Sequence, residues 1–195
     1  DKTLLQQKGI VYIINNTMNY NKNYQIDIMG SDNDYLIPNN KKEIYYMNKY
    51  TMLDNDYLAA VGTYFFQKGV RYDIKIYVNG KEKHIQSGLS PFIGFTTIKL
   101  NKYIPVKAND NVTVKIRSIN APYQEQCRQY IQEGISFYST DNKNWFDFAK
   151  KDQTACIKLY TVDASSIKTS VNKNSNIGYS VTLYDRLGET LKNAD

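Results

Sequence analysis

The chain has 195 residues, of which 42% are hydrophobic, with eighteen Tyr, one Trp and a formal net charge of +6. This length suits one domain with a core of its own, and a composition rich in Tyr but poor in Gly and Pro favours strands. Basic residues are spread along the chain and no apolar stretch is long enough to cross a bilayer, so nucleic-acid binding and membrane insertion are not expected.

Alternation of apolar and polar residues dominates the first third of the chain. A period of two residues is the pattern of a half-buried β-strand. It predicts strands over 9–15, 24–29, 44–51 and 58–66. The Asn and Asp residues between these segments suit the turns that join short antiparallel strands.

The clearest local prediction is a hairpin in the middle of the chain. In the segment 70–78, Val70, Ile74 and Val78 fall on one face, and charged residues alternate with them. Asn79 and Gly80 follow at once and suit a type I′ turn, because both central positions of that turn need positive φ. The segment 81–86 is then the returning strand.

The second half of the chain continues the same pattern. Strands are predicted over 95–100, 111–117, 134–139 and 155–162, an extended edge with a turn over 104–110, and one short helix over 124–131. Short strands at this spacing indicate an all-β fold, an antiparallel β-sandwich of the jelly-roll or galactose-binding-like type with at most one or two short helices.

The composition changes after residue 162. Residues 163–176 are rich in Ser, Lys and Asn, which is typical of a linker, and strand patterning returns over 180–191. The sandwich domain is therefore expected to span 1–162. Residues 163–195 hold a linker and strands, which are either a last pair of the same sandwich or the start of an immunoglobulin-like repeat.

The pentapeptide DNDYL occurs twice, at 32–36 and at 54–58. Calcium loops need several oxygen ligands at close spacing, and Asp32, Asp34 and Glu43 imitate part of such a loop. Apolar residues stand where further ligands and the turn glycine are needed, so turn chemistry is the preferred interpretation of both stretches. Asp32 and Asp34 remain the candidates for a structural calcium ion, and no other cofactor is expected.

Nucleophilic catalysis has little support in this sequence. The chain has one His and two Cys, and neither Cys lies in a nucleophile-like context. The two cysteines, Cys127 and Cys156, are interpreted as buried small residues or as one disulfide. A hydrolase built from Cys127 and His84 is the weakest of the alternatives, and the chain is not expected to be an enzyme.

The solitary Trp145 follows an Asn- and Asp-rich stretch at 141–144. Sugar-binding sites combine an exposed aromatic face, on which the C–H groups of a pyranose pack, with amides and carboxylates that bond its hydroxyls. The alternative is that Trp145 packs across its own hairpin. Further aromatic candidates, among which composition alone does not choose, are Tyr45, Tyr46, Tyr50, Tyr123 and Tyr138.

Several stretches, in order over residues 9–162, resemble one family. Residues 24–30 read YQIDIMG and are similar to its "YQYDPLG" opening, 57–64 read YLAAVGTY, and 134–139 with 155–161 resemble its closing motifs. The family is the lectin-like domain that follows papain-like cysteine peptidase domains in archaeal and bacterial adhesin-like surface proteins. Ile28 and Met29 depart from its pattern, which has Pro-Leu there.

The resemblance implies a non-catalytic domain at the cell surface or outside the cell. It binds a surface glycan or cell-wall polymer, or it acts as a brace packed against a neighbouring peptidase domain without a ligand of its own. Adjacent peptidase and immunoglobulin-like domains are the expected partners. The residues proposed to contact a ligand are Gln25, Asp27, Tyr46, Asn48, Tyr123 and Trp145.

Overall fold

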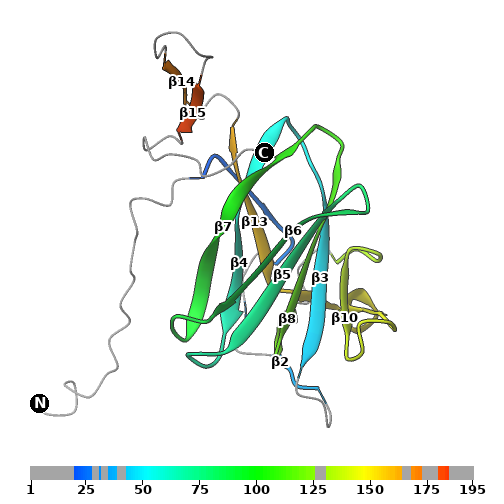
Figure 1. Ribbon diagram of the computed structural model, residues 1–195. Helices are drawn as coiled ribbons and strands as arrows, with labels where there is room; N and C mark the ends of the chain where they lie inside the picture. Colours follow the sequence, from blue (N-terminus) through cyan, green and yellow to red (C-terminus); the bar gives the residue numbers. More distant parts are fainter. Residues whose placement is uncertain are drawn as a thin grey trace, which may run out of the picture.

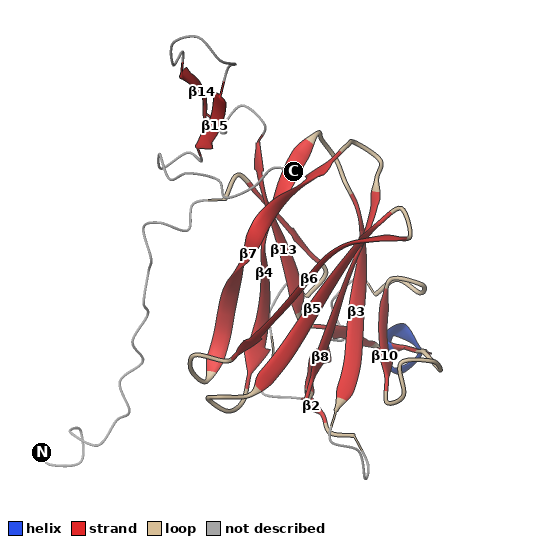
Figure 2. Cartoon of the chain, viewed as in Figure 1, coloured by secondary structure: helices blue, strands red, loops and turns tan. Residues whose placement is uncertain are grey.

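The computed structural model describes residues 20–27, 31, 35–38, 43–125 and 131–163, together with the backbone of two later strands. Within this part of the chain the regular elements are antiparallel strands, apart from one short 3-10 helix, η2 (Phe148–Lys151) (Figure 2). The predicted all-β fold is therefore confirmed.

Two sheets form the body of the molecule (Figure 1). The larger has six strands in the order β11 (Phe146–Asp147), β10 (Ser136–Ser139), β3 (Ile44–Thr51), β8 (Asn111–Ser118), β5 (Arg71–Val78) and β6 (Lys81–Leu89). The smaller has four, in the order β1 (Lys22–Gln25), β13 (Ile157–Asp163), β4 (Asp56–Phe65) and β7 (Gly94–Val106). A third sheet joins β12 (Gln153–Ala155), β9 (Ala121–Glu125) and β2 (Tyr35–Leu36).

The core lies between the two larger sheets. Buried and less buried residues alternate along β5 and β8, so that Ile74, Ile76 and Val114 point inward. Apolar residues from both sheets belong to one buried cluster, as expected of a sandwich. Burial of this apolar surface is the main source of stability, at about 25 cal/mol per Å².

Strand β4 is buried along nearly its whole length, because it lies between β13 and β7 and has small residues, Ala59, Ala60 and Gly62, near its middle. Gly62 is essential to this packing. A Cβ atom at Gly62 would lie 2.6 Å from Cζ of Phe95, so any side chain there would displace the ring. The outer strand β7 carries Pro105 at the sheet edge, where the missing N–H is tolerated.

The predicted hairpin is confirmed. Asn79 and Gly80 have φ values of 50° and 77°, as a type I′ turn requires, and strands β5 and β6 flank them. The side chain of Asn79 bonds both Asp110 and the backbone N–H of Asn111, which ties this turn to the loop before β8.

Two predicted elements differ from the structure. The segments 95–100 and 104–106 are parts of one strand, β7. The helix predicted over 124–131 is wrong at its start, because Gln124 and Glu125 pair with Thr154 and Gln153 in β12. Residues 126–130 lie outside the described part of the chain, as does the strand predicted over 9–15.

The strands after the sandwich pair with each other. β14 (Lys168–Asn172) and β15 (Ser180–Tyr184) form a separate two-stranded antiparallel sheet. The division of the chain at residue 162 stays a prediction.

Candidate ligand-binding site

Polar and aromatic side chains form rows on the outer face of the six-stranded sheet. In one row Tyr45 pairs with Arg117, which pairs with Asp73. In the next row, two residues further along β8 and β5, Lys115 pairs with Lys75. Because side chains two residues apart share a face of a strand, these rows lie beside each other on the face that points away from the core.

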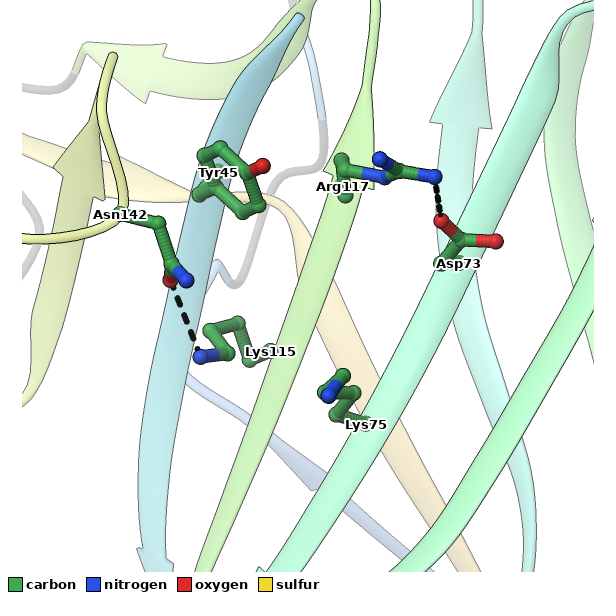
Figure 3. A pocket seen from close by; sticks show the side chains of 6 residues that line it. All are labelled: Tyr45, Asp73, Lys75, Lys115, Arg117 and Asn142. Atoms are coloured by element: carbon green, nitrogen blue, oxygen red, sulfur yellow. Dashed lines mark hydrogen bonds and ion pairs between the residues drawn. The ribbon is translucent and has the colours of Figure 1, made fainter.

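An open pocket of about 330 Å³ lies over the two rows (Figure 3). It is lined by Tyr45, Asp73, Lys75, Lys115, Arg117 and Asn142. Asn142 enters from the loop between β10 and β11, while the other residues come from β3, β8 and β5. Four separate segments of the sequence therefore build one surface, which we call the outer-face pocket.

Two of the three cations in the outer-face pocket are held by carboxylates. Arg117 forms ion pairs with Asp73 and, at 3.1 Å, with Glu43, and Lys75 lies 3.2 Å from Glu82. Burial acts to raise the pKa of Asp73, but hydrogen bonds from Ser87 and Arg117 outweigh it and the pKa is lowered. Asp73 is therefore a fixed anion that orients the Arg117 guanidinium.

Lys115 has a different environment. Its Nζ donates to Oδ1 of Asn142 at 3.0 Å and lies 5.3 Å from the ring centre of Tyr77 and 5.7 Å from that of Trp145. These are cation–π distances. Partial burial, and then the charge of Lys75, lower the pKa of Lys115.

The loop that carries Asn142 and Trp145 is ordered by one carboxylate. Asp141 accepts hydrogen bonds from the hydroxyl of Ser139, the backbone N–H groups of Lys143 and Asn144, and the side chain of Asn144. These bonds, of which those from the backbone are the strongest, hold the pKa of Asp141 far below its usual range. Asn142 has φ of 59°, a conformation that Asn tolerates well.

Trp145 is half-buried and lies beside the outer-face pocket, because its ring is within cation–π distance of Lys115, which lines the pocket. Of the six residues proposed from the sequence, it is the one found at this site. Tyr123 packs against Phe148, with ring centres 6.1 Å apart, on the core side of the molecule.

Tyr46 and Asn48 require correction, because both side chains are completely buried. The hydroxyl of Tyr46 lies 3.2 Å from that of Thr63, and Asn48 donates to the carbonyl of Ala155 at 3.0 Å. A side chain in this position cannot contact a ligand at the surface. Both are core residues: Tyr46 joins the six-stranded sheet to β4 of the four-stranded sheet, and Asn48 joins it to β12 of the third sheet.

Gln25 and Asp27 are brought together by Lys158, away from the outer-face pocket. The Lys158 Nζ donates to Oε1 of Gln25 at 3.0 Å and to Oδ2 of Asp27 at 3.1 Å. Burial of Asp27 raises its pKa to about 6, against the opposing charge of Lys158. Asp27 is completely buried, so it too is corrected from a ligand contact to a core residue. Gln25 is exposed, and its hydrogen bond with Lys158 fits a role in fastening β1 to β13.

The other sequence candidates have separate positions. His84 is buried and lies 3.1 Å from Oε1 of Gln86, and Cys156 is buried with a side-chain hydrogen bond to Asp27. Cys127, Asp32 and Asp34 lie outside the described residues. In the part of the chain that is described, no three His, Cys, Asp or Glu side chains are grouped to hold a metal ion, and no helix could cross a membrane.

Sequence reasoning did not select most of the outer-face pocket. The signal was present in the charged faces of the two alternating segments, which carry Asp73 and Lys75 in one and Lys115 and Arg117 in the other. Only the pairing of β5 with β8 makes these faces neighbours.

Comparisons with known proteins agree with this architecture. A family model described as "Lectin like domain" matches residues 23–161. The structure of the clostridial cysteine protease Cwp84 after propeptide cleavage is similar, with 15% identity and a TM-score of 0.60 over 73% of this chain and 40% of that one. No curated protein matches the sequence.

A second similar structure contains the cysteine protease and lectin-like domains of Cwp84, a surface layer associated protein of Clostridium difficile. Its identity is 15% and its TM-score 0.53, over 63% of this chain and 33% of that one. The present chain thus spans less than half the length of either structure. At this identity the likeness shows the fold alone.

Proposed function

Because the chain belongs to the lectin-like domain family, we propose that it is a non-catalytic module that binds a surface glycan or cell-wall polymer. The outer-face pocket is the proposed binding site. The observation that carries this proposal is the half-buried Trp145 held beside a pocket whose other residues are amide, hydroxyl and charged groups.

The side chains of the outer-face pocket have the chemistry that sugars need. An indole or phenol ring packs against the C–H groups of a pyranose, and Trp145 and Tyr45 supply such rings. The carboxylate of Asp73 accepts hydrogen bonds from hydroxyl groups, and the amide of Asn142 both donates and accepts them. A shallow site with few contacts fits low affinity per domain, which several copies of the binding site on one surface would raise.

The loop around Asp141 supports the same function. The four hydrogen bonds that fix this loop all come from groups of the chain itself. Binding therefore costs less conformational entropy than it would if the loop had to become ordered on contact.

The proposal also includes a cellular location for the domain. Cwp84 is a surface layer associated protein whose structure holds a cysteine protease domain together with a lectin-like domain. By analogy, the present domain would lie outside the cell or at its surface, where it would hold a neighbouring peptidase or adhesin module against the polymer.

Binding of the full chain to a glycan array and to isolated cell walls tests the proposal. Trp145→Ala should weaken binding about tenfold, the amount expected from one lost ring contact. The matched control is Phe146→Ala, because Phe146 is 53% exposed but pairs with Tyr138, on the opposite face of the sheet from Tyr45. Absence of binding to all sugars and walls, or equal loss in both variants, would count against the outer-face pocket.

A brace against a peptidase domain is the second candidate. Four large apolar side chains, Ile85, Leu89, Phe92 and Ile93, are about half exposed or more along β6 and the loop after it. Apolar groups exposed in this way are typical of an interface with another domain.

The brace is tested in the parent protein that carries a peptidase domain. Changing Phe92 and Ile93 to Ser should lower the thermal midpoint of the peptidase while glycan binding stays unchanged. The control is the same pair of changes in the present chain alone, where both side chains are already exposed and stability should change by less than about 1 kcal/mol. If the thermal midpoint of the peptidase does not change, this surface is not a brace.

A further inference from the structure

The six residues that line the outer-face pocket include more cations than carboxylates. Three of its lining residues, Lys75, Lys115 and Arg117, are cationic, while Asp73 is the one acidic residue among them. A neutral sugar needs no such excess of cations. A cation among them that has no carboxylate partner is therefore evidence about the class of ligand.

Two of these cations already have anionic partners. Arg117 contacts Asp73 and Glu43, and Lys75 contacts Glu82. Lys115 has no carboxylate within ion-pair distance among the described residues, and its hydrogen-bond acceptor is the neutral amide oxygen of Asn142. Lys115 therefore carries the charge in the outer-face pocket that remains available to an anion.

The surroundings of Lys115 make such an anion favourable. Its ammonium group is partly buried and lies within cation–π distance of the rings of Tyr77 and Trp145, and Lys115 is paired across the strands with Lys75. Burial and a neighbouring cation both disfavour the charged form of a lysine, which agrees with the lowered pKa of Lys115. An oxyanion at this position would relieve both effects at once.

The position of Lys115 beside Trp145 connects charge with sugar recognition. A ring that packs on Trp145 would place its substituents within reach of the ammonium group, because the two side chains are 5.7 Å apart, measured from Nζ to the ring centre. Asn142 accepts a hydrogen bond from the ammonium group through Oδ1, and its amide also carries N–H groups that can donate to a hydroxyl (Figure 3).

Resting on the proposed function, we propose that the ligand is an anionic glycan, a polymer that carries carboxylate or phosphate groups, and that Lys115 binds its oxyanion. Trp145 packs against the adjoining sugar ring. Arg117 and Lys75, already paired with protein carboxylates, contribute a positive field and not the direct contact.

Isolated cell walls of the source organism, in three forms, test the proposal with the full chain. One sample is untreated, one has its carboxylates converted to neutral amides with a carbodiimide and ethanolamine, and one has its phosphate-linked polymers removed with hydrofluoric acid. We expect binding to the untreated walls to fall about tenfold or more after one of the two treatments. The treatment that is effective identifies carboxylate or phosphate as the anion.

Substitutions at Lys115 assign the contact to this residue. Lys115→Met keeps the apolar stem but removes the charge, and it should lose about tenfold or more in binding to untreated walls while binding treated walls as the unaltered chain does. Lys115→Arg should retain most of the binding. Lys102→Met, on the exposed side of β7 in the other sheet, is the matched control for loss of one positive charge and should bind normally.

The outcomes separate this inference from the proposed function. If the chain binds walls equally before and after both treatments and Trp145→Ala abolishes that binding, the ligand is a neutral glycan and the inference is overturned, while the proposed function stands. If the chain binds no wall sample and no glycan, both are overturned. If Lys115→Met and Lys102→Met lose binding equally, only the net charge of the chain matters, and the assignment to Lys115 is wrong.

Thermal unfolding of each variant serves as the control for folding. A midpoint close to that of the unaltered chain shows that a loss of binding is not a loss of fold.

Discussion

Buried polar side chains of β3 join the six-stranded sheet to strands of the other two sheets, β13 and β12. Tyr50 donates from its hydroxyl to the carbonyl of Ile157 at 2.6 Å, and Asn48 donates to that of Ala155. A buried carbonyl left without a donor costs about 1–3 kcal/mol, so these bonds specify how β3 is placed against β12 and β13. This is a structural role for residues that the sequence alone made candidates for ligand binding.

The contribution of Tyr50 can be measured directly. We expect Tyr50→Phe to lower the free energy of unfolding by about 1–3 kcal/mol, because the ring is kept while the carbonyl of Ile157 loses its donor. Tyr35→Phe is the control, since Tyr35 is 38% exposed, and it should change stability by less than about 0.5 kcal/mol. Urea unfolding of both variants gives the comparison, and equal stability of the two would contradict the role given to Tyr50.

Asp27 makes stability depend on pH in an unusual direction. Its pKa is raised from 3.8 to about 6 by burial, so between these values the folded protein holds a proton that the unfolded chain has lost. This group therefore makes the free energy of unfolding fall as the pH rises from about 4 to about 6, and it has no further effect above that range. A carboxylate with a lowered pKa, such as that of Asp73, has the opposite effect: it stabilises the folded protein, and this contribution is lost as the pH falls toward its pKa.

The effect of Asp27 is isolated by Asp27→Asn, which cannot titrate. The stability of the native chain relative to this variant should be lower at pH 7 than at pH 4, by on the order of 1–3 kcal/mol. Urea unfolding at both pH values measures it. A difference between the two proteins that is the same at pH 4 and pH 7 would show that Asp27 titrates normally.

At the scale of elements, the edge strand β1 is held by side-chain ion pairs as well as by backbone pairing. It has four residues and pairs only with β13 in the described structure. Lys22 in β1 lies 3.1 Å from Asp54, 2.9 Å from Asp56 and 3.2 Å from Asp163. In the second DNDYL stretch, Asp54 and Asn55 form the bend between β3 and β4, while the remaining three residues begin β4, so the expected turn is found only at the start of the stretch. Its carboxylates hold the edge strand.

A double-mutant cycle tests this clamp. Lys22→Met should lower the free energy of unfolding by about 1–3 kcal/mol, because Asp56 is almost completely buried and would lose its cation. Adding Asp56→Asn to that variant should restore part of the loss, since no charge is then left buried. Additive losses in the double variant, measured by urea unfolding, would mean that the two side chains do not interact.

On the scale of the whole molecule, both large sheets contribute to one apolar cluster. Ile76 and Val114 of the six-stranded sheet belong to it together with Leu58 and Leu159 of the four-stranded sheet. A shared core of this kind leaves neither sheet able to unfold without exposing the apolar face of the other.

We therefore expect a single cooperative unfolding transition for the sandwich. Fluorescence of Trp145, on the loop between β10 and β11, and far-UV circular dichroism of all strands should change at the same urea concentration. Coincidence would also show that the loop of the outer-face pocket is part of the cooperative unit. An earlier change in Trp145 fluorescence would mean that this loop opens independently of the sandwich.

The sequence by itself determined the fold class and several local elements. Period-two alternation depends only on the pleat of a strand, and a type I′ turn depends only on the φ values that Asn79 and Gly80 accept, so both were readable without knowledge of distant contacts. The order of the motifs along the chain was likewise enough to predict the family.

Only the tertiary structure decided which residues form the site. Tyr45 and Tyr46 are chemically alike neighbours, yet Tyr45 lines the outer-face pocket and Tyr46 lies in the core, because the placement of β3 over the four-stranded sheet selects the inner face. Likewise Lys115 and Lys75 meet only through the register of β8 with β5. Alternation gives the period of a strand but neither its inward face nor its neighbours, since those are set by the burial of distant apolar residues and by long-range pairing.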